Sequence, residues 1–386
     1  MVQPPDDPET ADVLAQVRAL KDAIREAELT GSVNPDDRAR CRKLERQLRE
    51  RSWQTDGPGH SVADVQPHQI NDALADSDQT LVSFFNHQGQ LHALTLAGGT
   101  TLHYALGPMA AVAEHTRRLL ADLNAFTGRR LPSRLTATIQ SSIRHQTEQL
   151  DKTLFSEFAC HLGDRDLVVV PTQVLSSLPW GLLPTLRGRA VVVAPSASVW
   201  HAARDRPADG PGPALLASGP DLTHAETELD TIAEHHYGSV LLRGADATPA
   251  AILSALDGAS VAHLAAHGYH EPDNVLFSRL DFAEGPLMAY DIARLRTPPA
   301  HVTLSACDVG RAKVAVGDET LGFTAALLYA GTRTVVSSVA KVEHEAAADV
   351  MTAYHAELVA GKTPAHALAA ASSRQLFSPF VCYGAG

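Results

Sequence analysis

The sequence predicts an α/β protein in which helices sandwich a mostly parallel sheet, preceded by a smaller α+β and helical N-terminal region. Two observations carry this prediction. From Asp166 onward, short apolar runs such as DLVVV and AVVVA end at Pro, Ser or Gly, and runs that are apolar on both faces are typical of buried parallel strands. Amphipathic helical patterns alternate with these runs, which indicates the repeated βαβ order of a parallel sheet.

Length and composition narrow the class of protein. The chain has 386 residues, of which 45% are hydrophobic and 20% charged, so we expect a globular protein with two or three domains. Its net charge of -12, with no basic stripe, argues against direct binding to nucleic acid or to an anionic membrane. There is no apolar run long enough to cross a bilayer and no secretory signal pattern at the N-terminus, which predicts a cytoplasmic protein. The four cysteines include no CxxC pair, so we expect reduced thiols.

Residues 1–56 predict a helical hairpin. Apolar residues recur at helical spacing, the stretch TGSVNPDD interrupts them, and the pattern then resumes. The apolar positions are Val13, Val17, Leu20 and Ile24 in the first helix, and Leu44 and Leu48 in the second. This hairpin either packs on the rest of the chain or presents a surface to a partner.

Residues 62–146 predict a small α+β region. The stretch TLVSFFNHQGQLHALTLAGGTTLHYAL alternates strand-like runs with turn residues at 86–89 and 98–99, which predicts three short strands. Helical patterns follow from about 109 to 124 and from 133 to 162. The α/β domain is then expected over residues 147–386.

Within residues 147–386, the helices have recognisable starts. Thr248–Pro249 and Thr363–Pro364 each place an N-cap threonine before a proline in the first helical position. The strands are predicted in LVVVP, VVVAP, PALLASGPD, ASVAHLAAHG, AHVTLSACDVG and TRTVVSSVAKV.

Two of these predicted strands end in chemically reactive residues. One ends at His267, which Gly268 follows, and the next ends directly before Cys307. A separation of 40 residues suits one crossover, so both ends lie at the same sheet edge if the strands are parallel. An imidazole beside a thiol can act as its base, and a glycine leaves its backbone N–H available to an oxyanion.

Other interpretations of these residues stay open at this point. A cysteine in a strand is often an inert core thiol, and a lone histidine at a strand end is often structural. His263, His267 and His270 could also be three zinc ligands, although we expect the strand to end at Gly268 and there is no HExxH motif. A serine hydrolase is disfavoured, because no GxSxG motif occurs.

The order of several segments resembles the CHAT family, whose members are relatives of caspases and separase. The matching segments include LVVVPTQVLSSLPWGLLP, VVVAPSASVW, VAHLAAHGYH, PLMAYDIARL, VTLSACDVG and GKTPAHALAAA, and together they span about residues 147–386. The resemblance implies a caspase-like fold and a Cys–His endopeptidase. In that assignment His267 is the general base, Cys307 is the nucleophile, and the amides of Gly268 and Cys307 form the oxyanion hole.

The resemblance also implies regulation of the site by a partner protein or ligand, through the segment that follows Cys307. Two departures concern the surroundings of the dyad: DVG follows the cysteine where ETG is common in the family, and Ala340 stands where many members have Trp. No TPR array accompanies the domain. Asp308, Asp318 and Glu319 either form an acidic substrate pocket or cap the helix that follows.

The leading function hypothesis is a cysteine endopeptidase that cleaves a protein partner, in a step of bacterial defence or cell death that the resemblance alone implies. The alternatives are an idle CHAT-fold scaffold or sensor, and an enzyme acting on small amides or esters. None of the three requires a metal or another cofactor.

Overall fold

The computed structural model describes residues 65–126, 132–208, 210, 212–222, 224–269, 278–306 and 319–386, with scattered residues between 12 and 47. The strands are β1 Gln79–His87, β2 Gln90–Ala97, β3 Thr100–Pro108, β4 Asp166–Val170, β5 Val191–Val193, β6 Leu215–Ser218, β7 Val240–Leu242, β8 Val261–Tyr269, β9 Arg279–Phe282, β10 Gly285–Met288, β11 His301–Ala306, β12 Thr334–Ser338 and β13 Phe380–Gly384. The helices are α3 Pro67–Asp76, α4 Met109–Phe126, α5 Ser133–Phe155, α6 Ala159–Leu162, α7 Ala197–Arg204, α8 Ala225–His235, α9 Pro249–Leu256, α10 Ala289–Ile292, α11 Glu319–Ala330, α12 His344–Val359 and α13 Pro364–Ser372. Short 3-10 helices are η1 Gln173–Ser177, η2 Trp180–Leu182, η3 Pro184–Leu186 and η4 Gly244–Asp246.

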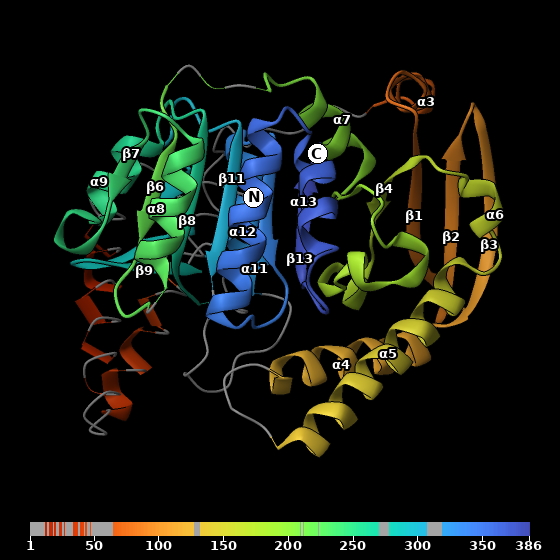
Figure 1. The fold of residues 1–386 in the computed structure, drawn as a ribbon, viewed down its shortest axis with the longest axis horizontal. Helices are drawn as coiled ribbons and strands as arrows, with labels where there is room; N and C mark the ends of the chain where they lie inside the picture. Colours follow the sequence, from red (N-terminus) through yellow and green to blue (C-terminus); the bar gives the residue numbers. More distant parts are fainter. Residues whose placement is uncertain are drawn as a thin grey trace.

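The described strands form one continuous sheet (Figure 1). Its main order is β10-β9-β8-β11-β12-β13-β5-β4-β1-β2-β3, and β6 pairs with β7 and β8 beside this path. β8, β11 and β12 are parallel, whereas β13 is antiparallel to β12 and runs in the same direction as β5 and β4. The C-terminal ends of β8, β11 and β12 therefore lie in one row with the N-terminal ends of β13, β5 and β4. We refer to this row of strand ends as the sheet edge.

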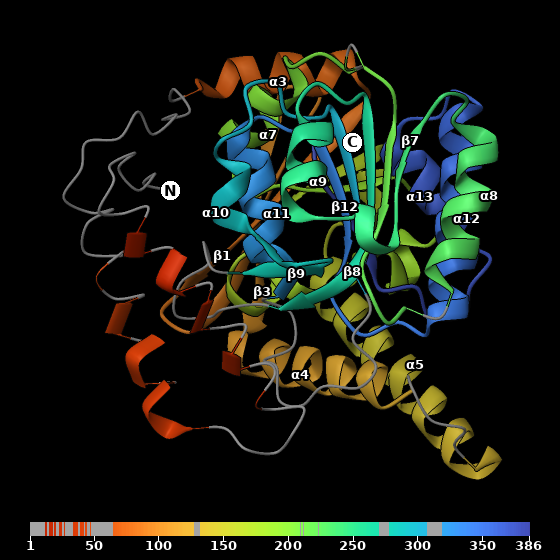
Figure 2. The ribbon, with the colours of Figure 1, turned by 90° about the vertical axis from the view of Figure 1, so that its left-hand side faces the viewer.

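Helices cover both faces of this sheet (Figure 2). α8, α12 and α13 lie on one face, and α10 and α11 lie on the other. Buried side chains divide into two large clusters accordingly, one of which contains Trp180, Phe155 and Phe282, while the other contains Trp200 and Tyr354. The predicted sandwich of helices around a mostly parallel sheet is confirmed.

The N-terminal strands belong to the same sheet. β1 pairs in parallel with β4, with Leu81 opposite Val168, and β2 and β3 extend the sheet as an antiparallel meander. The three strands expected between 80 and 106 are present, with connections at residues 88–89 and 98–99. The proposed domain boundaries stay a prediction.

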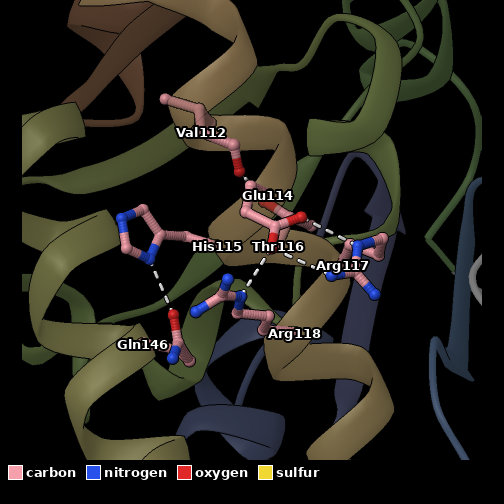
Figure 3. A network of polar contacts seen from close by, with 7 residues as sticks. All are labelled: Val112, Glu114, His115, Thr116, Arg117, Arg118 and Gln146. Atoms are coloured by element: carbon pink, nitrogen blue, oxygen red, sulfur yellow. Dashed lines mark hydrogen bonds and ion pairs between the residues drawn. The ribbon is translucent and has the colours of Figure 1, made fainter.

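The α4–α5 hairpin packs below the sheet edge (Figures 1 and 3). Between the helices, His115 Nδ1 and Gln146 Oε1 lie 2.7 Å apart. On the exposed side of α4, hydrogen bonds from Arg117 and Arg118 lower the pKa of Glu114 to about 2. The C-terminal end of α4 contacts the sheet domain, because Asn124 Oδ1 accepts a hydrogen bond of 2.9 Å from the Lys341 backbone.

Part of the N-terminal hairpin packs on the sheet domain. Val17 and Cys41 form a buried cluster with Met288 at the end of β10. Val13, Leu20, Ile24, Leu44 and Tyr290 surround it. The alternative in which this hairpin docks on the rest of the chain is therefore supported for its described residues, and Leu48 lies outside them.

Local signals in the sequence fix several helix starts. The Thr248 side chain accepts a hydrogen bond from the Ala251 backbone, and the Thr363 side chain accepts one from the His366 backbone, as the two Thr–Pro pairs predict. Among the described cysteines, Cys41, Cys160 and Cys382, there is no disulfide. Within the described part of the chain, no helix has the length and apolar character to span a membrane.

Candidate functional site

The two predicted strand ends are neighbours in the sheet. β8 and β11 are parallel, and their register places Ala266 opposite Ala306. The next residue of β8 is the half-buried His267, and the residue after Ala306 is Cys307. Adjacent strands lie about 4.8 Å apart, so the sheet brings His267 beside the point where the chain enters position 307.

The remaining predicted site residues are only partly described. Cys307, Asp308 and Asp318 lie outside the described residues. Glu319 is the first residue of α11, directly after Asp318. Gly268 lies inside β8, where it is paired with Leu280 of β9. The roles predicted for these residues therefore stay predictions.

β8 continues past Gly268 to Tyr269, so the expectation that the strand ends at this glycine is wrong. The reason is the antiparallel pairing with β9, which extends the strand beyond its apolar run. His263 and His267 consequently share a face of the sheet. His270 lies outside the described residues, and the described ones contain no group of three or more His, Cys, Asp or Glu side chains suited to hold a metal ion.

One further histidine, His344, lies in the electrostatic surroundings of His267. His344, the first residue of α12, has a lowered pKa because burial disfavours its charged form and because His267 opposes a second positive charge. Glu228 of α8 acts on His344 in the opposite direction. Sequence reasoning missed both residues, since His344 follows β12 without a distinctive motif and Glu228 belongs to a polar-looking helix.

Three histidines, the buried His263 and His355 and the half-buried His236, form a chain between β8, α8 and α12. His355 bridges the other two: its Nε2 lies 3.1 Å from His263 Nδ1, and its Nδ1 lies 2.9 Å from His236 Nε2. Glu228 Oε1 is 3.1 Å from His263 Nε2, which is an ion-pair distance without hydrogen-bond geometry. Burial keeps the pKa of His355 well below its ordinary value, with neighbouring His263 and His236 adding to the effect. Burial therefore favours the neutral imidazole form of His355 and of His236.

Close packing beside His267 predicts the effect of one substitution. Gly219 follows β6, and its N–H donates a 2.7 Å hydrogen bond to the Ala265 carbonyl. A Cβ on this residue would lie 2.3 Å from the Asp281 carbonyl oxygen and 3.3 Å from Ala266 Cβ. Gly219→Ala is expected to destabilise the protein by about 1–3 kcal/mol, measured by urea unfolding. Gly181→Ala, whose Cβ would meet nothing within 4 Å, is the matched control, and equal effects of the two changes would contradict this packing.

The comparisons with known proteins agree with this arrangement. A family model described as the CHAT domain matches residues 127–379, which is well over half of the chain. The chain belongs to the CHAT family. The resemblance of the ordered segments to this family is thereby confirmed.

This CHAT protein shares its fold with a caspase-like peptidase. Separase from Saccharomyces cerevisiae, solved in complex with securin, superposes with a TM-score of 0.61 at 11% identity, covering 82% of this chain and 30% of the separase chain. A second structure of that complex gives 0.59 at 12% identity, covering 82% and 31%. The chain thus spans about a third of the separase chain. The predicted caspase-like fold is confirmed.

Other comparisons add less. The Porphyromonas gingivalis proteinase RgpB, in a complex of its pro- and mature domains, matches with a TM-score of 0.40 at 12% identity, covering 70% of this chain and 76% of that one. A search of curated proteins finds no match.

Proposed function

We propose that this CHAT protein is a cysteine endopeptidase in which Cys307 is the nucleophile and His267 the general base. The observation that carries the proposal is the parallel register of Ala266 with Ala306, because His267 and Cys307 are the residues that directly follow this pair in the sequence. The caspase-like fold supports it, because peptidases of this superfamily share that architecture. The domain from residue 147 to 386 carries the chemistry.

The proposed reaction has two stages. His267 takes the proton of the Cys307 thiol, and the thiolate attacks the carbonyl carbon of the peptide bond. The backbone amides of Gly268 and Cys307 stabilise the oxyanion. When the C–N bond breaks, His267 gives its proton to the leaving amine, which leaves a thioester. His267 then deprotonates a water molecule, whose oxygen attacks the thioester carbon. The C–S bond breaks, the carboxylic acid leaves, and the protonated His267 returns its proton to the Cys307 sulfur.

Substrate selection and regulation belong to the same proposal. Asp308 directly follows Cys307, and Asp318 and Glu319 stand at the start of α11 in the sequence; these acids either receive a basic substrate side chain or cap that helix. The separase structures contain a partner protein, securin, which supports control of this site by a partner or ligand. We place the protein in the cytoplasm of a bacterium, in defence or cell death.

The second candidate function is a CHAT-fold scaffold or sensor that does not use its dyad. Incubation with a tagged protein encoded beside this chain separates the two functions. We expect a fragment with the wild-type protein and none with Cys307→Ala, and Cys160→Ala is the control because that thiol is exposed elsewhere. Equal cleavage by wild type and Cys307→Ala would show that the assigned nucleophile is wrong.

A further inference from the structure

A large cavity opens at the sheet edge that also carries the candidate dyad. Its volume is about 640 Å³, within the range of ligand pockets. It lies between α5, the loop before β5 and the segment from α13 to β13, and apolar walls come from Trp180, Leu182, Leu368 and Phe377. Its described lining includes neither residue of the proposed dyad.

Strand register gives the position of this cavity relative to the dyad. Phe380, at the start of β13, pairs with Ser338 at the end of β12. The cavity wall formed by Phe380, Val381 and Val191 therefore lies at the edge where β8 and β11 end. β13 and β5 are two and three strands away from β11, which is about 10 to 14 Å at the usual strand spacing.

The cavity is basic although the chain as a whole is acidic. Its lining includes the arginines Arg144, Arg187, Arg189 and Arg374, whereas the net charge of the chain is -12. Glu148 is the single carboxylate among the described lining residues. Such a local reversal of charge favours an anionic ligand.

Two of the four arginines already have partners in the protein. Arg374 pairs with Glu357 at 3.0 Å, and Arg189 donates to the backbone carbonyls of Gly163 and Arg165. Arg144 and Arg187 are exposed, and neither side chain makes an ion pair or hydrogen bond with any residue that the structure describes. These two guanidinium groups can pair with carboxylates of a ligand, and the apolar walls can contact apolar side chains between those carboxylates.

We propose that this cavity binds an acidic, extended segment of a partner protein. A peptide in extended conformation rises about 3.3 Å per residue, so three to four residues bridge the distance from the cavity to the end of β11. One extended peptide can therefore fill the cavity and also reach the dyad, whereas a small free anion can fill only the cavity. The role of this partner as substrate rests on the proposed peptidase function, whereas its binding does not.

The test uses the full-length Cys307→Ala protein, so that binding is measured without cleavage. The probe is a fluorescein-labelled octapeptide in which glutamate alternates with leucine, and its counterpart has glutamine in place of glutamate. By fluorescence anisotropy we expect the glutamate peptide to bind at least tenfold more tightly. Arg144→Glu with Arg187→Glu should weaken that binding at least tenfold, and added NaCl should weaken it too.

The control makes the same charge change outside the cavity: Arg134→Glu with Arg296→Glu, both exposed positions. Three results would overturn the proposal: equal binding of the two peptides, no binding at peptide concentrations up to about 1 mM, or an equal loss of affinity in the control variant. If inorganic phosphate displaces the labelled peptide at the same concentration as the unlabelled peptide does, the cavity is a site for small anions instead. If the peptide does not bind to Cys307→Ala while the wild-type protein cleaves its substrate, this proposal fails and the proposed peptidase function stands.

Discussion

Replacing Cys307 with alanine is expected to lower kcat/KM for cleavage of the protein substrate by roughly 10⁴-fold or more, because the proposed reaction loses its nucleophile. His267→Ala should lower it by roughly 10²- to 10⁴-fold, the usual contribution of a general base. The measurement is the rate of substrate cleavage under single-turnover conditions, with any activating partner present.

Two exposed residues serve as matched controls for this experiment. Cys160→Ala removes an exposed thiol, and His68→Ala removes an exposed imidazole on α3, so both should retain wild-type rates. Thermal unfolding checks that all four variants remain folded. If His267→Ala cleaves the substrate at the wild-type rate, another group acts as the base.

Lowering the pH below about 6.5 is expected to destabilise the protein steeply, although no carboxylate needs to titrate. Burial lowers the pKa of His301 to about 3 and that of His355 well below its ordinary value. In the unfolded chain both groups take up protons near pH 6.5, so the unfolded state binds more protons than the folded state below that pH. Each group then removes about 1.4 kcal/mol of stability per pH unit, and this loss is absent above pH 6.5.

Urea unfolding at pH 7.5, 6.5 and 5.5 measures this effect (three conditions within the range where histidine, rather than carboxylate, titrates). The two groups together predict a loss of roughly 2–3 kcal/mol between pH 6.5 and 5.5. His355→Gln, which removes the central ring of the histidine chain, should reduce the slope by about half, while His68→Gln on the exposed face of α3 should leave it unchanged. A stability that does not change between pH 7.5 and 5.5 would contradict the neutral, buried state of these imidazoles.

Local features of the fold could be predicted from the sequence because local physics determines them. The apolar runs that became β4, β8, β11 and β12 are buried on both faces, and the Thr–Pro pairs begin α9 and α13. The pairing of β1 with β4 could not be predicted, since it joins residues 79–83 to 166–170 across two long helices. The extension of β8 past Gly268 likewise depends on β9, whose sequence is too short to indicate its partner.

The candidate site shows the same division. The proximity of His267 to the end of β11 could be predicted, because the two apolar runs indicate neighbouring parallel strands, whose carboxyl ends lie on the same side of a sheet. The proximity of His344 to His267, and of Glu228 to His263, could not be predicted, because His344 and Glu228 lie on helices whose packing is set by apolar contacts elsewhere. The same is true of the arginines around the cavity, which come from three separate segments of the chain.

The proposed function requires His267 to activate the Cys307 thiol as a nucleophile. Mass spectrometry of the protein treated with a peptide acyloxymethyl ketone tests it most directly, because the thiolate displaces the carboxylate of the reagent and forms a stable thioether. The predicted result is one adduct per chain, mapped to Cys307, and formed at least about 10²-fold more slowly in His267→Ala. Labelling of Cys160 in place of Cys307, or equal rates in wild type and His267→Ala, would contradict the claim.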